Sequence, residues 1–317
     1  MYFPIAEIDV NPLVPPAVAF VISFFTSMGG VSGAFLLLPF QMSFLGFTSP
    51  SVSATNQLFN IVAIPSGVYR YMKEGRMVWP LTWVVIVGTL PGVLIGAIVR
   101  VRYLPDPKNF KFFVGLVLLY IGCRMVQDIF FKKADKNKQA SAEEEFQKLV
   151  KGFSARQKKE NLPAIAVREF SLTRISYDFY GRNFTINTLY IFILSAVVGI
   201  IGGVYGIGGG SIIAPFFISF FGLPVYTVAG AALMGTFVTS VAGVAFYQAI
   251  APFYPGMAVA PDWLLGFLFG IGGTAGMYFG ARAQKFMPAR IIKMILAACI
   301  FFVAGKYILN FFGQWNF

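Results

Sequence analysis

The residues best suited to bind a ligand lie in two glycine-rich apolar stretches, one in each half of the chain. The first, residues 26–40, reads TSMGGVSGAFLLLPF, and the second, residues 202–216, reads GGVYGIGGGSIIAPF. Gly and Pro break a helix and leave backbone N–H and C=O groups without intrahelical partners. In lipid, such a break is tolerated only where it is buried in protein or lines a wet cavity.

The two stretches repeat each other at a fixed offset. Gly30, Gly33 and Pro39 recur 176 positions later as Gly206, Gly209 and Pro215. Paired broken segments at corresponding places in two halves indicate the binding site of a transporter. The alternative is close helix packing through small residues.

Side-chain donors are expected from the helix that follows each stretch. Asn56 and Asn60 share a helix face, and buried amides are costly in lipid, so they either bind a ligand or join helices by hydrogen bonds. The hydroxyls of Thr236, Thr239 and Ser240 could instead bond to their own helix. The predicted substrate-binding residues are Gly30, Ser32, Gly33, Ser53, Thr55, Asn56, Gln57, Asn60, Gly208, Gly209, Gly210, Ser211, Thr236 and Thr239.

The near absence of charged side chains inside the apolar segments favours an anion that is bound by backbone groups. Asp, Glu and His are absent from the segment middles, and Lys and Arg are nearly so. Free N–H groups and the positive dipole end of a helix attract an anion, so we expect two helix N-termini, near Ser32 and Gly209, to face it. No intramembrane proton relay, cofactor or metal is expected, which favours passive, potential-driven or ion-coupled transport.

Composition sets the fold class. The chain is 57% hydrophobic and 12% charged, with a mean hydropathy of +0.72. These values predict an all-α polytopic membrane protein, with the lipid bilayer as a partner. Cys123 and Cys299 are too few for a disulfide framework, and the N-terminus has no basic region typical of a cleaved signal peptide. The net charge of +12 lies mainly in a central insert and at helix ends, so nucleic acid is not expected as a partner.

Ten apolar segments divide into two halves of five. They are 13–28, 31–47, 50–69, 78–100 and 109–131, then 186–204, 210–222, 225–250, 261–281 and 289–312. The first two of each half are short, and the last three are long enough to span a bilayer. Because five is odd, the halves are expected to have opposite orientations, as in inverted repeats. The predicted parts are a membrane half at 1–131, an insert at 132–184 and a membrane half at 185–317.

A second repeat concerns the later helices. Gly88, Gly92 and Gly96 recur as Gly272, Gly276 and Gly280 at an offset of 184. Small residues at this spacing share one face, which predicts tight helix packing, within the chain or in a homodimer.

The insert carries 12 Lys and Arg against 7 Asp and Glu, so it is expected in the cytoplasm. An amphipathic helix is predicted at 142–151 and a hairpin at 170–179. It is either a linker joining the two halves or a regulatory domain. If the insert lies in the cytoplasm, counting the membrane crossings from it places both termini outside. The sequence is compatible with a bacterial inner membrane.

One loop does not follow this topology. Arg100, Arg102, Lys108 and Lys111 flank a loop that the crossings place outside, although basic residues favour the inside. Attraction of an anionic substrate or a wrong topology would each explain it.

The motifs GGVSG at 29–33 and GIGGGS at 206–211, each followed by a proline, resemble the TauE/SafE family of sulfite exporters and sulfonate permeases. So do SVSATN at 51–56, its counterpart TVAGAA at 227–232, and the glycine-spaced later helices. The resemblance covers nearly all of the membrane part and excludes the insert. It implies transport of small anions such as sulfite, sulfoacetate or related organosulfonates.

Three other classes remain open from the sequence. An anion channel could use the same paired dipole ends, and saturable counterflow would separate it from a carrier. A membrane enzyme would need a nucleophile, base or metal cluster at depth, and the sequence provides no such group. A structural or receptor role would leave the duplicated break unexplained.

Overall fold

The computed structural model describes most of the chain as helix. The described residues are 1–29, 32–73, 77–130, 165–171, 173–179, 182–221, 223, 225–283 and 289–313. The predicted helix at 142–151 lies outside these ranges, as does the candidate site residue Gly30.

The helix bounds follow the predicted segments closely. The first half contains α1 (Val14–Gly29), α2 (Ala34–Ser43), α3 (Ser51–Ala63), α4 (Pro65–Lys73), α5 (Trp79–Arg102) and α6 (Pro107–Phe130). The second half contains α8 (Thr188–Tyr205), α9 (Gly210–Phe221), α10 (Val225–Ile250), the 3-10 turn η2 (Ala251–Phe253), α11 (Trp263–Ala283) and α12 (Ala289–Phe311).

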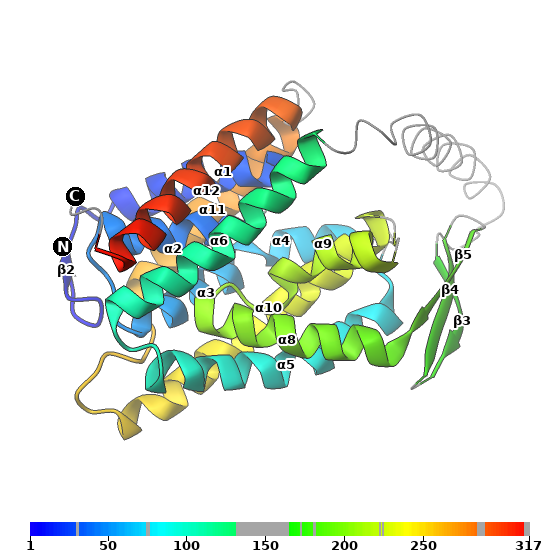
Figure 1. Ribbon diagram of the computed structural model, residues 1–317, viewed down its shortest axis with the longest axis horizontal. Helices are drawn as coiled ribbons and strands as arrows, with labels where there is room; N and C mark the ends of the chain where they lie inside the picture. Colours follow the sequence, from blue (N-terminus) through cyan, green and yellow to red (C-terminus); the bar gives the residue numbers. More distant parts are fainter. Residues whose placement is uncertain are drawn as a thin grey trace.

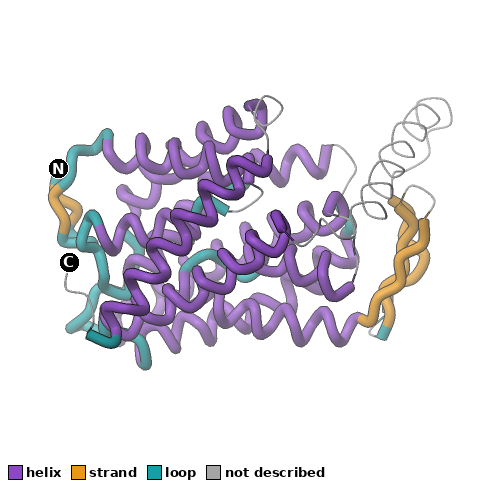
Figure 2. Tube along the Cα trace, turned by 45° about the horizontal axis from the view of Figure 1, so that its top comes forward, coloured by secondary structure: helices purple, strands orange, loops and turns teal. Residues whose placement is uncertain are grey.

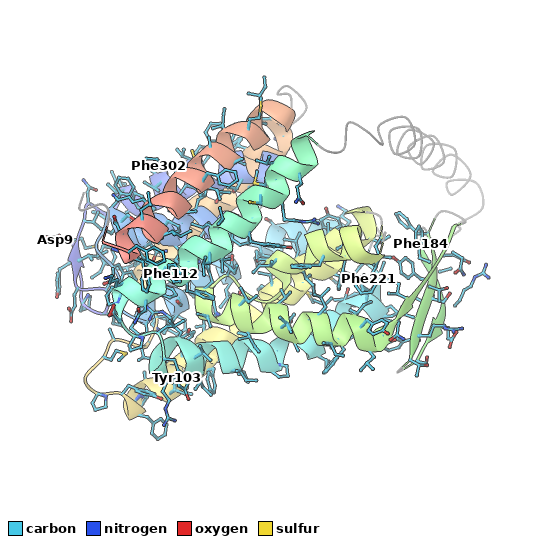
Figure 3. The ribbon with its side chains drawn as sticks, in the orientation of Figure 1. Asp9, Tyr103, Phe112, Phe184, Phe221 and Phe302 are labelled. Atoms are coloured by element: carbon cyan, nitrogen blue, oxygen red, sulfur yellow. The ribbon has the colours of Figure 1, made fainter. Side chains whose placement is uncertain are left out.

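Within the described part of the chain, 6 helices are long and apolar enough to cross a membrane: α5, α6, α8, α10, α11 and α12. Their outer surfaces are apolar. Phe302 projects from α12 with 75% of its surface exposed, and Ile95 of α5 and Phe267 of α11 are also exposed (Figure 3). Such a surface suits hydrocarbon, which confirms the predicted polytopic α-helical membrane class.

The third segment of the first half differs from the prediction. Residues 50–69 were expected to form one spanning helix, but α3 ends at Ala63 and α4 begins at Pro65. Proline lacks the N–H that would continue the ladder, and its ring clashes with the carbonyl four residues earlier. The counterpart α10 has Val241 at the equivalent position and runs unbroken over 26 residues.

The helices pack as two reciprocal halves. α5 lies along α8, while its counterpart α11 lies along α1, and α6 pairs with its own counterpart α12. α3 and α10 pack against each other, and their contact is here called the crossing. The helix of the fourth apolar segment in each half, α5 or α11, therefore packs on the first helix of the other half, an exchange that suits inverted repeats.

Glycines on one face of α5 and of α11 let these helices pack closely against α8 and α1. A β-carbon at Gly92 of α5 would lie 2.8 Å from the Ile200 nitrogen of α8. A β-carbon at Gly276 of α11 would lie 3.0 Å from the Phe20 Cα of α1. Two backbones can approach this closely only where no side chain intervenes, so the glycine-spaced helices are packing elements, as predicted.

Two ends of the bundle are distinct. The N-terminus and the C-terminal end of α12 lie at one end, here called the termini end, together with the short hairpin of β1 (Tyr2–Phe3) and β2 (Ile8–Asp9) (Figure 1). The opposite, sheet end carries an antiparallel sheet of β3 (Ile165–Phe170), β4 (Arg174–Phe179) and β5 (Arg182–Asn187). The predicted hairpin at 170–179 is therefore part of a three-stranded sheet.

The sheet is packed against the helical bundle. Ile175, Tyr177 and Phe179 of β4 are fully buried. The Tyr177 hydroxyl donates to Thr227 Oγ1 of α10 over 3.2 Å, and burial raises the pKa of this phenol to about 12. β5 passes directly into α8, where Asn187 Oδ1 accepts from the Leu189 nitrogen over 2.9 Å. The second part of the insert is thus a sheet that packs on the bundle and leads directly into α8.

Candidate functional site

The two helix breaks meet inside the bundle. α8 and α9 form a hairpin whose outer ends both lie at the sheet end (Figure 1), and residues 206–209 form its bend. Loop segments lie among the helices as well as at the ends of the bundle (Figure 2). Asn56 Nδ2 of α3 donates to Ala34 O at the start of α2 over 3.2 Å and to Gly206 O over 3.0 Å. One amide nitrogen thus touches the backbone of both breaks.

The bend of the second break depends on glycine. α8 ends with Gly206 in the left-handed region at φ 85°, and the N–H groups of Gly206 and Ile207 both donate to Gly202 O. A β-carbon at Gly206 would lie 2.6 Å from Ser53 Cα. Both the backbone conformation and the contact with α3 therefore exclude a side chain.

A row of α3 side chains holds this bend. Ser53 Oγ donates to Val204 O over 3.0 Å, and Asn60 Nδ2 donates to Ile207 O over 3.0 Å and to Ser240 Oγ over 3.5 Å. With Asn56, they bind three carbonyls at and just after the end of α8, those of Val204, Gly206 and Ile207. Both hydrogens of each asparagine amide are used, so these amides join helices in the observed structure.

The first break is smaller. Ser32 Oγ accepts from the Ala34 nitrogen over 3.3 Å, and Gly33 precedes α2. A β-carbon at Gly33 would lie 2.8 Å from Ser23 Oγ of α1. The hydroxyl of Tyr205, at the end of α8, donates to Phe35 O over 2.8 Å and so links the two breaks a second time.

The predicted residues of the second half line the start of α9. Gly209 N–H donates to Thr239 Oγ1 over 3.2 Å, and Ser211 Oγ lies 3.2 Å from Thr236 Oγ1. The two threonine hydroxyls also donate to the carbonyls of Ala232 and Gly235 on their own helix. Gly208 and Gly210 contact α10 closely: β-carbons there would lie 2.8 Å from Ser240 Oγ and 2.7 Å from Thr236 Oγ1.

Gln57 differs from its neighbours on α3. It is fully buried at the crossing with α10, yet within the described ranges neither Oε1 nor Nε2 has a hydrogen-bond partner. Its carboxamide lies against Gly243 of α10 and fills the space that a side chain at position 243 would need. A β-carbon at Gly243 would lie 3.0 Å from Gln57 Nε2. Asn60 Oδ1, one turn along α3, is likewise without a partner among the described residues.

Thr55 lies apart from this cluster. Its Oγ1 accepts from the Asp262 backbone nitrogen over 2.9 Å, at the start of α11. The structure therefore brings together the predicted residues Ser32, Gly33, Ser53, Asn56, Gln57, Asn60, Gly208, Gly209, Gly210, Ser211, Thr236 and Thr239, and directs Thr55 to a different contact.

Sequence reasoning missed three polar residues at the breaks. Gln41 Nε2 of α2 donates to Asn56 Oδ1 over 3.4 Å, and Tyr247 of α10 donates to Gly203 O over 3.3 Å. Gln41, Tyr205 and Tyr247 are all buried, and each makes a hydrogen bond at or beside the breaks. An amide in the apolar segment of Pro39 was a visible signal for Gln41, whereas the two tyrosines resembled ordinary packing aromatics.

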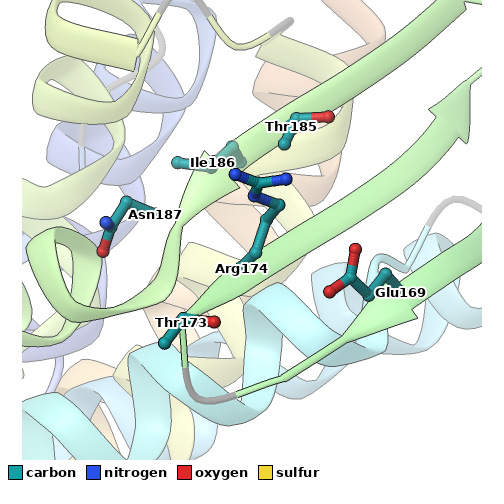
Figure 4. A pocket seen from close by; sticks show the side chains of 6 residues that line it. All are labelled: Glu169, Thr173, Arg174, Thr185, Ile186 and Asn187. Atoms are coloured by element: carbon teal, nitrogen blue, oxygen red, sulfur yellow. The ribbon is translucent and has the colours of Figure 1, made fainter.

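The chemistry available at the breaks is polar and uncharged. No group of three His, Cys, Asp or Glu residues that could hold a metal occurs in the part of the chain that the structure describes. A hollow of about 470 Å³ lies elsewhere, on the sheet, lined by Glu169, Thr173, Arg174, Thr185, Ile186 and Asn187 (Figure 4). Since its lining residues all belong to the sheet and its turns, it does not join the breaks.

Comparison with known proteins matches residues 16–307 to the sulfite exporter TauE/SafE family. The probable membrane transporter protein YunE of Bacillus subtilis (strain 168) is 24% identical over 115 residues, which are 36% of this chain and 41% of that protein. The probable membrane transporter protein YdhB of the same organism is 26% identical over 124 residues, or 39% of this chain and 47% of that protein. These matches span less than half of each relative, and no solved structure matches the chain significantly. Because the family match includes both glycine breaks and nearly all of the helical bundle, the chain belongs to the TauE/SafE family.

Proposed function

We propose that this protein is a secondary membrane transporter of small anions, with sulfite, sulfoacetate and related organosulfonates as the first candidates. The site is the crossing of α3 and α10 beside the two breaks. The family name and the names of both relatives support transport, and the reciprocal packing of the halves supports alternating access around a central site.

The electrostatics of the breaks favour an anion. α2 and α9 both begin at the breaks, and the first N–H groups of a helix lack intrahelical partners and carry the positive end of its dipole. Among the described residues the one buried carboxylate is Asp262, which accepts from the Leu265 nitrogen over 3.0 Å at the start of α11. No acid therefore opposes an anion at the crossing in the described part of the site.

The single observation that carries the proposal is Gln57. A buried amide without partners is unfavourable, and its persistence needs a reason such as a ligand. Its Nε2 can donate to a substrate oxygen, and Gly243 leaves the room that the carboxamide occupies. Asn56 and Asn60 position the break, while Gln57 contacts the substrate.

The experiment is transport by the purified full chain in proteoliposomes. Uptake of sulfite, sulfoacetate and taurine is compared with sulfate and matched carboxylates, and counterflow separates a carrier from an anion channel, the second candidate. We expect saturable counterflow of at least one sulfur anion. Gln57→Leu should abolish it while leaving thermal stability unchanged or raised.

Gln41→Leu is the matched control. Gln41 is an equally buried glutamine beside the same break, but it donates to Leu37 O and Asn56 Oδ1. Its loss should lower stability and leave the KM of transport near the native value. Uptake by the native protein that never saturates, or a Gln57→Leu variant with native KM and kcat, would contradict the proposal.

A further inference from the structure

Arg100, near the C-terminus of α5, is a fully buried charge without an acidic partner. Its side chain has no exposed surface, and among the described residues no carboxylate contacts it. Nη2 donates to Thr48 O over 3.0 Å, Nη1 donates to Leu104 O, and the guanidinium carbon lies 3.7 Å from the centre of the Phe110 ring. Carbonyl oxygens and an aromatic face solvate the cation but leave its positive charge uncompensated.

The guanidinium also has unused hydrogen-bonding capacity. Its Nε has no partner in the described ranges, and each terminal nitrogen carries two hydrogens. An arginine fork with free N–H groups matches the geometry of an oxyanion.

Buried polar groups connect Arg100 to the second break. The Tyr247 phenol lies close enough to Arg100 for the two to interact electrostatically, and Ser53 lies beside it. Tyr247 OH donates to Gly203 O over 3.3 Å, and Ser53 Oγ donates to Val204 O over 3.0 Å. Arg100 therefore stands beside the end of α8, between the termini end of the bundle and the crossing of α3 and α10.

The charge is not a requirement of the repeated architecture. At the offset of 184 that relates α5 to α11, position 100 corresponds to Gln284, so only one repeat carries a cation here. The exposed Arg102, two residues further along the same helix, belongs to the basic loop that the positive-inside pattern did not explain.

We propose that Arg100 is a second anion-binding station, at the termini end of the transport route, which holds a small oxyanion through the free N–H groups of its guanidinium. The inference rests on the proposed transport of anions and adds a residue that the crossing site does not contain. An anion there would compensate a charge that the described residues of the protein leave unpaired.

The test compares Arg100→Gln, Arg100→Lys and the control Arg102→Gln. Uptake kinetics are measured in proteoliposomes, and thermal unfolding is followed during a sulfite titration at fixed ionic strength. We expect Arg100→Gln to raise the KM of anion uptake about tenfold or more, with kcat changed less than about threefold, and to remove the stabilisation by sulfite. Arg102→Gln should match the native protein within about twofold in both readouts.

Arg100→Lys keeps the charge and loses the fork, so KM should rise about three- to tenfold while some stabilisation by sulfite persists. If Arg100→Gln does not fold, this variant decides the question. A purely structural arginine would lower the unfolding temperature without changing KM or the response to sulfite, and that result would overturn the proposal. If the native protein transports none of the anions, the proposed function fails, while the sulfite titration still tests Arg100 separately.

Discussion

The side-chain amide of Asn56 donates to the main-chain oxygen of Gly206, 3.0 Å away and 150 residues later in the chain. The same nitrogen donates to Ala34 O over 3.2 Å. The two repeats are therefore joined at their breaks by one side chain. Asn56 has no amide equivalent in the second repeat, where Ala232 stands at the offset of 176.

Asn56→Leu should be strongly destabilising, because it leaves the buried carbonyls of Ala34 and Gly206 without this donor. Each unsatisfied group costs about 1–3 kcal/mol, so we expect a loss of about 2–6 kcal/mol of stability for the two groups. Thermal unfolding of the purified protein measures it. Gln57→Leu, the adjacent and equally buried amide, is the control, since its atoms have no described partner to lose. Equal losses in the two variants would refute the joining role.

Gly206→Ala should prevent folding or cost more than about 3 kcal/mol. The left-handed conformation costs about 1–2 kcal/mol for a residue with a β-carbon, and that atom would also collide with Ser53 of α3. Gly46 has a similar φ of 72° but nothing within 4 Å of its hypothetical β-carbon. Gly46→Ala should therefore show the conformational cost alone. Expression yield and unfolding temperature compare the two, and similar values would refute close packing at Gly206.

Gly92→Ala and Gly276→Ala should each separate a helix pair by the width of a methyl group. The added atom would meet the carbonyl of Ala196 in the first case and of Phe20 in the second, and backbone cannot move aside as a side chain can. Overpacking of this kind costs about 1–3 kcal/mol or more. Gly305→Ala on α12 meets nothing within 4 Å and should be neutral or slightly stabilising through helix propensity. An unfolding temperature lowered equally by all three changes would contradict the assigned packing.

Tyr177 should make docking of the sheet sensitive to strong alkali. The pKa of its phenol is raised from 10.0 to about 12 by burial, so the folded protein keeps this proton where the unfolded chain releases it. The stability contributed by the neutral phenol is complete below pH 10 and is lost as the pH rises from 10 towards 12. Absorbance of the phenolate, followed beside thermal unfolding over this range, measures the effect.

Tyr177→Phe should lose this part of the alkaline sensitivity and the hydrogen bond to Thr227, at a cost of about 1 kcal/mol. Tyr190, which is 64% exposed, provides the control Tyr190→Phe, expected to leave the pH profile unchanged. Identical profiles for the native protein and Tyr177→Phe would show that the phenol does not titrate with unfolding.

The helical architecture can be predicted from the sequence alone, because hydropathy and helix breaking are local properties. The segments predicted at 186–204 and 210–222 match α8 and α9 within two residues at each end, because the run of glycines between them favours a break, where Gly206 and Gly208 have positive φ. The glycine spacing around Gly92 and Gly276 likewise predicted close helix faces. Pro65 carried the same kind of signal for the end of α3, and the long apolar segment obscured it.

The role of each buried polar group, in contrast, depends on tertiary packing. Asn56 and Gln57 are adjacent amides on one helix, yet Asn56 donates to two carbonyls and Gln57 meets no described partner. Thr55, between Ala54 and Asn56, turns to α11, and Arg100 is buried although its sequence position suggested an exposed loop. These contacts depend on which atoms the fold brings near each side chain, and those of Asn56 with Gly206 and of Thr55 with Asp262 join residues 150 or more positions apart. The side-chain period along one helix does not predict them.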